Sequence, residues 1–119
     1  MQENSDISQV CWIRVGALGD LLVALAALEQ THKKFSNAKV IVVGPKLWLE
    51  LLEPSLWPRV NGVFVVNARA KGDLYVPKEG KWDVSEKEMT LRSLFSRCQA
   101  SVNHRVESYR YAWPAFFAG

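Results

Sequence analysis

Three consecutive segments at the start of the chain decide the fold, and they read QVCWIRV (9–15), GALGD (16–20) and LLVALAAL (21–28). The first is apolar enough for a strand, and Arg14 is its one charged residue. The third is dense in Leu and Ala, which are strong helix formers, and its apolar residues follow helical spacing. The sequence therefore predicts a strand at 9–15, a glycine turn, and a mostly buried helix over 21–34.

Further along, the β-branched run KVIVV at 39–43 and VFVV at 63–66 are continuous apolar segments. Strands that are buried on both faces, as in parallel sheets, have this composition. The other expected elements are a short helix at 46–53, a long loop at 67–84, a helix from the capping box Ser85-x-x-Glu88 to Cys98, a strand at 100–106, and a helix at 107–118.

Because buried strands alternate with helices, we expect an α/β fold with a parallel sheet and right-handed crossovers. Residues 1–8 are expected to form a flexible N-terminus, and 9–119 a single domain. Ligands of such sheets bind at the carboxyl ends of the strands. The turn at 16–20 is therefore the expected site.

The composition bounds the class of protein. The chain has 119 residues, 49% hydrophobic and 23% charged, which fits one domain with a small core. The polar N-terminus does not resemble a signal peptide, and no apolar run reaches the roughly 18 residues of a membrane span. Cys11 and Cys98 lack metal-site spacing, so we expect no metal site and two buried thiols in a reducing compartment, most simply the cytoplasm.

The net charge of +3 is unevenly distributed. Residues 1–66 sum to zero, residues 67–107 carry +2, and Arg110 supplies the last unit. This bias is compatible with an anionic ligand and equally with a solvated loop of mixed charge. No like-charge block or aromatic–basic pattern points to nucleic acid.

The glycine turn places Gly16 and Gly19 around the start of the helix, followed by Asp20. It lacks the dinucleotide pattern Gly-x-Gly-x-x-Gly and the Lys-Ser/Thr of a P-loop. A carboxylate at this position would repel a phosphate, so the turn is better suited to presenting a carboxylate. Asp20 is either a general base toward a hydroxyl or a residue that only complements the helix dipole.

The string from Ile13 to Leu22, IRVGALGDLL, with AAL at 26–28, closely resembles the N-terminus of family 9 glycosyltransferases, the lipopolysaccharide heptosyltransferases and their relatives. The stronger part of the resemblance covers about residues 10–53, and a weaker part extends to 119. The resemblance implies a Rossmann-like parallel sheet with flanking helices, the N-terminal acceptor-side domain of a GT-B enzyme.

In that family a second, C-terminal domain binds the nucleotide-sugar donor, such as ADP-heptose, and transfer inverts the anomeric centre without a metal. The resemblance implies that Asp20 is the general base and that Gly16 and Gly19 shape the turn. It also places Arg69 and Lys71 toward an acidic acceptor. The donor-binding domain is absent from this sequence, so we expect a truncated domain that is inactive alone.

The sequence departs from the family near its end. The family's Asp-x-Gln-Gly is replaced by His104-Arg105-Val106-Glu107, and Arg110 stands at the later basic position as an acceptor-binding candidate. The implied partner is a glycan or lipopolysaccharide inner-core acceptor. Through it the protein would reach the inner face of the cytoplasmic membrane.

Two alternatives to the enzyme remain open at this point. One is a non-catalytic Rossmann-like module that holds a nucleotide or an anionic sugar. The other is a degenerate, truncated product that folds without activity.

Overall fold

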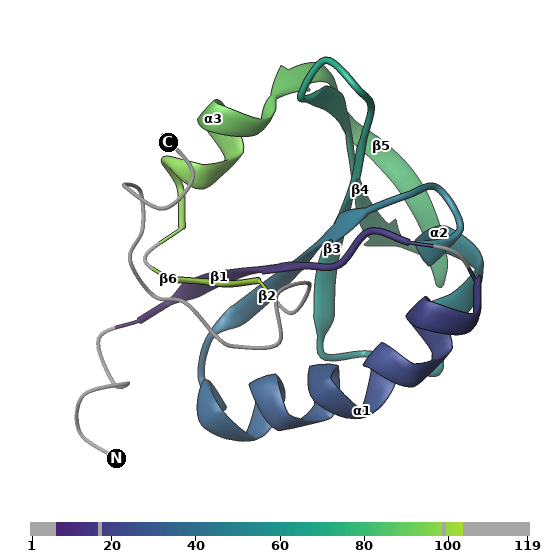
Figure 1. The fold of residues 1–119 in the computed structure, drawn as a ribbon, viewed down its shortest axis with the longest axis vertical. Coiled ribbons are helices and arrows are strands. Elements are labelled where there is room, and N and C mark those ends of the chain that lie inside the picture. The colour runs from purple at the N-terminus through teal and green to yellow at the C-terminus, as the bar shows by residue number, and fades with distance from the viewer. Residues whose placement is uncertain (1–6, 17, 99, 104–119) are drawn as a thin grey trace.

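The computed structural model describes residues 7–16, 18–98 and 100–103, the last four by their backbone. It is an α/β fold in which one mixed sheet of six strands has the order β5-β4-β3-β2-β1-β6 (Figure 1). The elements in chain order are β1 (Gln9–Ile13), α1 (Leu18–Lys34), β2 (Lys39–Gly44), α2 (Trp48–Leu51), β3 (Val60–Val66), β4 (Lys71–Lys78), β5 (Lys81–Thr90), α3 (Leu91–Phe95) and β6 (Ala100–Asn103).

Four strands form the expected parallel part of the sheet. β1 lies between β2 and β6, and β2 pairs with β3, all in parallel. In β3 the register shifts around Asn61, whose Oδ1 accepts the backbone N–H of Val40 at 2.9 Å. The strands predicted from the apolar runs are confirmed. The strand predicted at 100–106 is confirmed over 100–103, and residues 104–106 lie outside the described residues.

The rest of the sheet is antiparallel, so the prediction of an all-parallel sheet with a loop at 67–84 is wrong. β4 and β5 form a hairpin that continues from β3. Its turn is the pair Glu79 and Gly80, both with positive φ (55° and 79°), between the paired Lys78 and Lys81. Such two-residue turns match the twist of a hairpin. Side chains along β5 alternate between exposed and half-buried, as on a sheet edge.

The helix predicted from Ser85 to Cys98 is also wrong over most of its length. Ser85 lies within β5, and the helix α3 covers only Leu91–Phe95. Its N-cap is Thr90, whose Oγ1 accepts the N–H of Ser93 at 3.0 Å. Pairing of β5 with β4 has therefore overridden the local capping-box pattern.

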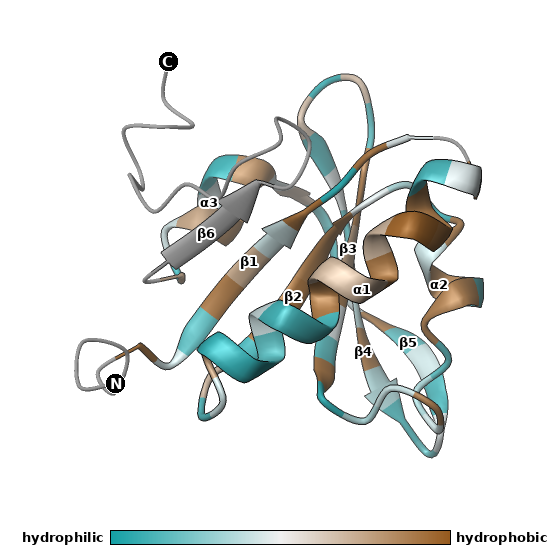
Figure 2. Cartoon of the chain, turned by 60° about the horizontal axis from the view of Figure 1, so that its bottom comes forward, coloured by the Kyte–Doolittle hydropathy of each residue, from teal (hydrophilic) through white to brown (hydrophobic). Residues whose placement is uncertain are grey.

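Each face of the sheet has its own apolar core because alternate strand residues point to opposite sides. Val10 and Trp12 of β1 pack with α1 and α2 on one face, whereas Cys11 and Ile13 pack with α3 on the other. Figure 2 shows α1 as largely hydrophobic along its N-terminal half and hydrophilic toward its C-terminal end. Helices thus pack on both faces of the sheet, as in the α/β class, although the short α3 covers only part of its face.

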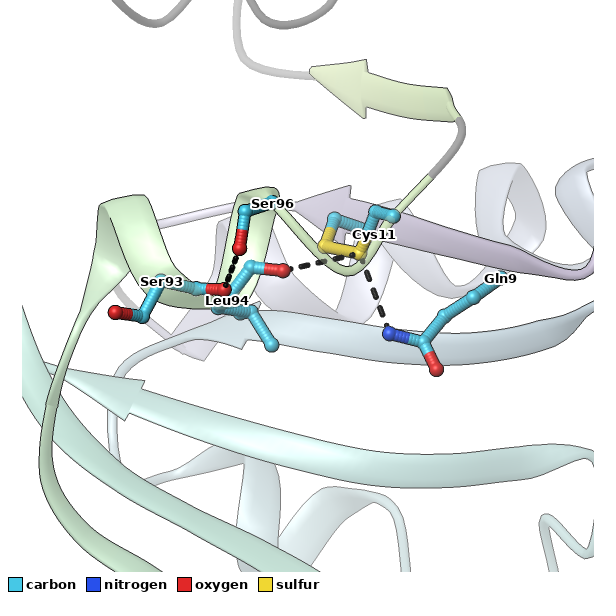
Figure 3. The surroundings of a disulfide bond; sticks show 6 residues. Gln9, Cys11, Ser93, Leu94 and Ser96 are labelled. Atoms are coloured by element: carbon cyan, nitrogen blue, oxygen red, sulfur yellow. Dashed lines mark hydrogen bonds between the residues drawn. A yellow bond between two sulfur atoms is a disulfide. The ribbon is translucent and has the colours of Figure 1, made fainter.

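The two cysteines form a disulfide that joins β1 to Cys98, which lies three residues beyond the end of α3 (Figure 3). Cys11 and Cys98 are both buried, as expected, with Cα atoms 6.2 Å apart. The prediction of free thiols is wrong. Because disulfides persist in oxidising surroundings, the cysteines no longer support a reducing compartment.

His32, in the last turn of α1, is a buried titratable residue and is only 3% exposed. Its Nε2 is buried and has no hydrogen-bond partner among the described residues. Burial, and then the nearby charge of Arg59, lower the pKa of His32, while Glu29 opposes the shift.

The segment 107–118, predicted as a helix, lies outside the described residues. None of the helices in the described part of the chain combines the length and the apolar character that crossing a membrane requires.

Candidate functional site

The parallel strands end at one edge of the sheet, and this carboxyl edge carries the residues singled out in the sequence. Gly16 lies in the turn after β1, and Gly19 and Asp20 lie in the first turn of α1. The turn after β3 holds Arg69, and Lys71 opens β4. β2 lies between β1 and β3, so these two groups are separated by about 10 Å at the strand axes. The structure brings both groups to one edge without contact between their side chains.

Asp20 is presented to solvent by the glycine turn. It lies in the first turn of α1, where the helix dipole favours a carboxylate, and its side chain is 61% exposed. Gly16 has φ 155°, and a Cβ there would lie 3.1 Å from Asp20 Oδ2. Gly16 therefore permits a backbone conformation and a close approach that most other residues would strain.

Gly19 has a different position from the one expected. It lies inside α1, and a Cβ added there would meet no described atom within 4 Å. Its small size is therefore not needed for packing within the described chain, and it leaves open space beside Asp20.

Arg14 is a site residue that the sequence reasoning missed. Its Nη2 lies 3.8 Å from Asp20 Oδ1, and its side chain is only 18% exposed. Its Nε is buried without a hydrogen-bond partner among the described residues. The available signal was that Arg14 is the single charge in an apolar strand, directly before the glycine turn.

Two hydrogen bonds fix the end of β1. The Arg14 N–H donates to Val43 O at 3.0 Å, and the Trp48 indole N–H donates to Arg14 O at 3.0 Å. Gly44 makes room for this arrangement, because a Cβ there would lie 2.3 Å from Arg14 O and 2.4 Å from Trp48 Nε1. The roles of Gly44 and Trp48 depend on tertiary contacts, so no local pattern could have shown them.

The turn after β3 is held by Asn67. Its Oδ1 accepts the N–H of Arg69 at 2.8 Å and that of Lys71 at 3.3 Å, and Ala70 adopts φ 60°. Arg69 and Lys71 are exposed, and so is Lys46 after β2, which the sequence reasoning did not include. This part of the edge is therefore cationic. Arg110, the remaining acceptor candidate, lies outside the described residues.

The surface beside Asp20 is apolar. Leu18 and Leu22 are 50% and 49% exposed, and Val23 is 76% exposed. The prediction that α1 is mostly buried is therefore wrong for this side of the helix. A carboxylate, an apolar helix surface and a cationic turn share the carboxyl edge.

Among the described residues, no three His, Cys, Asp or Glu side chains are grouped so that they could hold a metal ion. In comparisons with known proteins, no family model, no curated protein and no solved structure matches this chain.

Proposed function

We propose that the chain is the Rossmann-like, acceptor-side domain of a GT-B glycosyltransferase, with Asp20 as the general base. The observation that carries the proposal is the position of the Asp20 carboxylate. It is exposed in the first turn of α1, at the carboxyl edge of the sheet and next to Gly16. The likeness of residues 13–22 to family 9 glycosyltransferases adds the reaction class.

The strand order supports this choice of site. In the parallel part, β3-β2-β1-β6, the chain order reverses between β1 and β6. Open α/β sheets bind ligands at the carboxyl ends of the strands where such a reversal occurs. The helix that follows β1 is α1, and Asp20 lies in its first turn. Asp20 is therefore next to the point where the strand order reverses.

The chemistry proposed for Asp20 is proton removal from an acceptor hydroxyl. The hydroxyl oxygen attacks the anomeric carbon of the donor as the bond to the nucleotide diphosphate breaks, and the configuration inverts. The proton passes to a carboxylate oxygen of Asp20. Arg14, at 3.8 Å, would hold that carboxylate in place, while the exposed side of Asp20 leaves access for the hydroxyl.

The cationic turn would bind the acceptor. Arg69 and Lys71, with Lys46 as an addition from the structure, are exposed at the same edge and would pair with phosphates or acidic sugars of a lipopolysaccharide-type inner core. Arg110 remains a further candidate. Through such an acceptor the enzyme would work at the inner face of the cytoplasmic membrane.

The donor site belongs to a second domain in this proposal. We therefore expect the 119-residue chain to bind acceptor and to show no measurable ADP-heptose binding or transfer alone. Calorimetry with a phosphorylated Kdo–lipid acceptor and with ADP-heptose tests both expectations. Tight ADP-heptose binding, or no acceptor binding, would contradict the domain assignment.

Charge variants test the acceptor surface. Replacing Arg69 and Lys71 together by Ala should weaken acceptor binding and reduce its dependence on salt. The matched control replaces Lys33 and Lys34 by Ala, since these lie at the other end of α1. Equal loss in both double variants would show that only net charge matters.

A non-catalytic module for anionic sugars is the second candidate. The pairing of Asp20 with Arg14 favours it, because an engaged carboxylate can be structural. Transfer that is unchanged by Asp20→Asn would select this candidate over the enzyme.

A further inference from the structure

An open pocket of about 250 Å³ lies at the opposite edge of the sheet from Asp20. Gln9 and Lys39 begin β1 and β2 there, and Asn61 is near the start of β3. The full lining is Gln9, Lys39, Ile41, Asn61, Leu74, Val76, Leu94 and Arg97. None of these residues belongs to the site proposed for transfer.

The pocket exists because the helix on this face is short. α3 has five residues and is about 7.5 Å long, so it covers only part of the face. Gly62 contributes no side chain to the same face, and a Cβ there would lie 2.8 Å from Ile41 Cδ1. The missing side chain leaves room for Ile41 Cδ1 beside β3, and Ile41 lines the pocket from there.

The walls of the pocket are fixed by several contacts. The Asn61 Oδ1 bond to Val40 N–H holds one rim residue at 2.9 Å. The Gln9 amide N–H donates to Cys98 Sγ at 3.5 Å, and Figure 3 shows Gln9 and Leu94 on either side of the disulfide. Arg97 is held by a two-fold hydrogen bond to Glu86 at 2.5 and 2.8 Å. The pocket is thus preformed, as ligand sites usually are.

The floor of the pocket is apolar, whereas its rim is polar and cationic. Ile41, Leu74 and Leu94 are buried and give an apolar floor. The rim has two amides and two cations, and none of the lining residues in the described chain is a carboxylate. Arg97 is partly neutralised by Glu86, whereas Lys39 is exposed and forms no ion pair with the described residues. An apolar body with a single negative charge complements this arrangement.

We propose that this pocket binds a small amphipathic monoanion, a carboxylate with a short apolar tail, whose charge faces Lys39 and whose tail lies on Ile41, Leu74 and Leu94. The volume equals that of about eight water molecules, which limits the ligand to a small one. The proposal is independent of the glycosyltransferase assignment, since it uses no residue of the carboxyl edge.

Octanoate is the probe, with octylamine and 1-octanol as charge controls, titrated into the full 119-residue chain. We expect saturable octanoate binding with a Kd of about 1 mM or below, seen by calorimetry and by amide shifts at 39–41 and 74–76. Octylamine should bind more weakly. Equal binding of octanoate and octylamine, the absence of saturation, or shifts centred on Leu18, Leu22 and Val23 would overturn the proposal.

Two variants with matched controls locate the binding. Lys39→Glu should weaken octanoate binding roughly fivefold, whereas Lys46→Glu at the other edge should not. Val76→Phe should fill the pocket and abolish binding, whereas Val23→Phe on exposed α1 should leave it intact. If Lys39→Glu and Val76→Phe, both folded by their amide spectra, bind octanoate like the parent chain, the pocket is not the site.

Discussion

The guanidinium of Arg14 and the carboxylate of Asp20 lie 3.8 Å apart across the glycine turn that joins β1 to α1. The Arg14 side chain is largely covered and the Asp20 side chain is largely exposed. An ion pair with an exposed partner contributes at most about 1 kcal/mol to stability. The pair therefore matters for where the carboxylate is held rather than for how stable the fold is.

Two glycines at the carboxyl edge should respond oppositely to the same substitution. Gly44→Ala places a Cβ 2.3 Å from the backbone oxygen of Arg14 and should destabilise the protein by about 1–3 kcal/mol. Gly19→Ala adds a methyl to an open position of α1 and should stabilise it by up to about 1 kcal/mol. Urea unfolding measures both. A Gly44→Ala protein as stable as the parent chain would contradict the packing described around Trp48.

Reduction of the disulfide should lower the free energy of unfolding by a large part of its value. The bond joins residues separated by 87 positions, and a loop of that length corresponds to roughly 4–5 kcal/mol in the chain-entropy account. Unfolding with and without a thiol reductant measures the difference. The control is the double variant Cys11→Ala and Cys98→Ala, which should not respond to reductant. Alkylation of two free thiols in the untreated, folded protein would refute the pairing.

His32 should make stability fall in mild acid. The folded protein lowers the pKa of His32 below 6.5, so the unfolded chain binds the proton more readily. This contribution is complete above about pH 6.5 and is lost as pH falls toward the folded pKa, with a slope of at most about 1.4 kcal/mol per pH unit.

Urea unfolding between about pH 5 and pH 7 checks the His32 prediction, because histidine side chains ordinarily titrate in this pH range. The variant His32→Gln should lose this part of the slope of unfolding free energy against pH, however stable the variant itself is. His104→Gln is the matched control and should keep the slope. Identical slopes in the two variants would show that His32 is not the titrating group.

The sequence was sufficient for the parallel half of the fold. The continuous apolar runs at 39–43 and 63–66 predict strands that are buried on both faces, and the structure has β2 and β3 there. The position of Asp20 at a strand end followed from the same pattern, because a glycine turn between an apolar strand and a helix places its residues at the carboxyl edge.

The other half depended on long-range contacts. β4 and β5 are polar, and their pairing outweighed a helix signal at Ser85 and Glu88 that is purely local. Cys11 and Cys98 meet only after α3 folds onto the second face. Gly44 and Trp48 likewise contact Arg14 only in the folded sheet. Spacing along the chain contains none of these relationships.

The central claim is that Asp20 acts as a base in sugar transfer. The most direct test is transfer from ADP-heptose to a phosphorylated Kdo–lipid acceptor by this domain joined to a donor-binding domain, with Asp20→Asn compared to the parent protein. We predict that kcat falls about 100- to 10,000-fold while acceptor binding to the 119-residue chain is unchanged. Transfer at the parental rate in Asp20→Asn would contradict the claim.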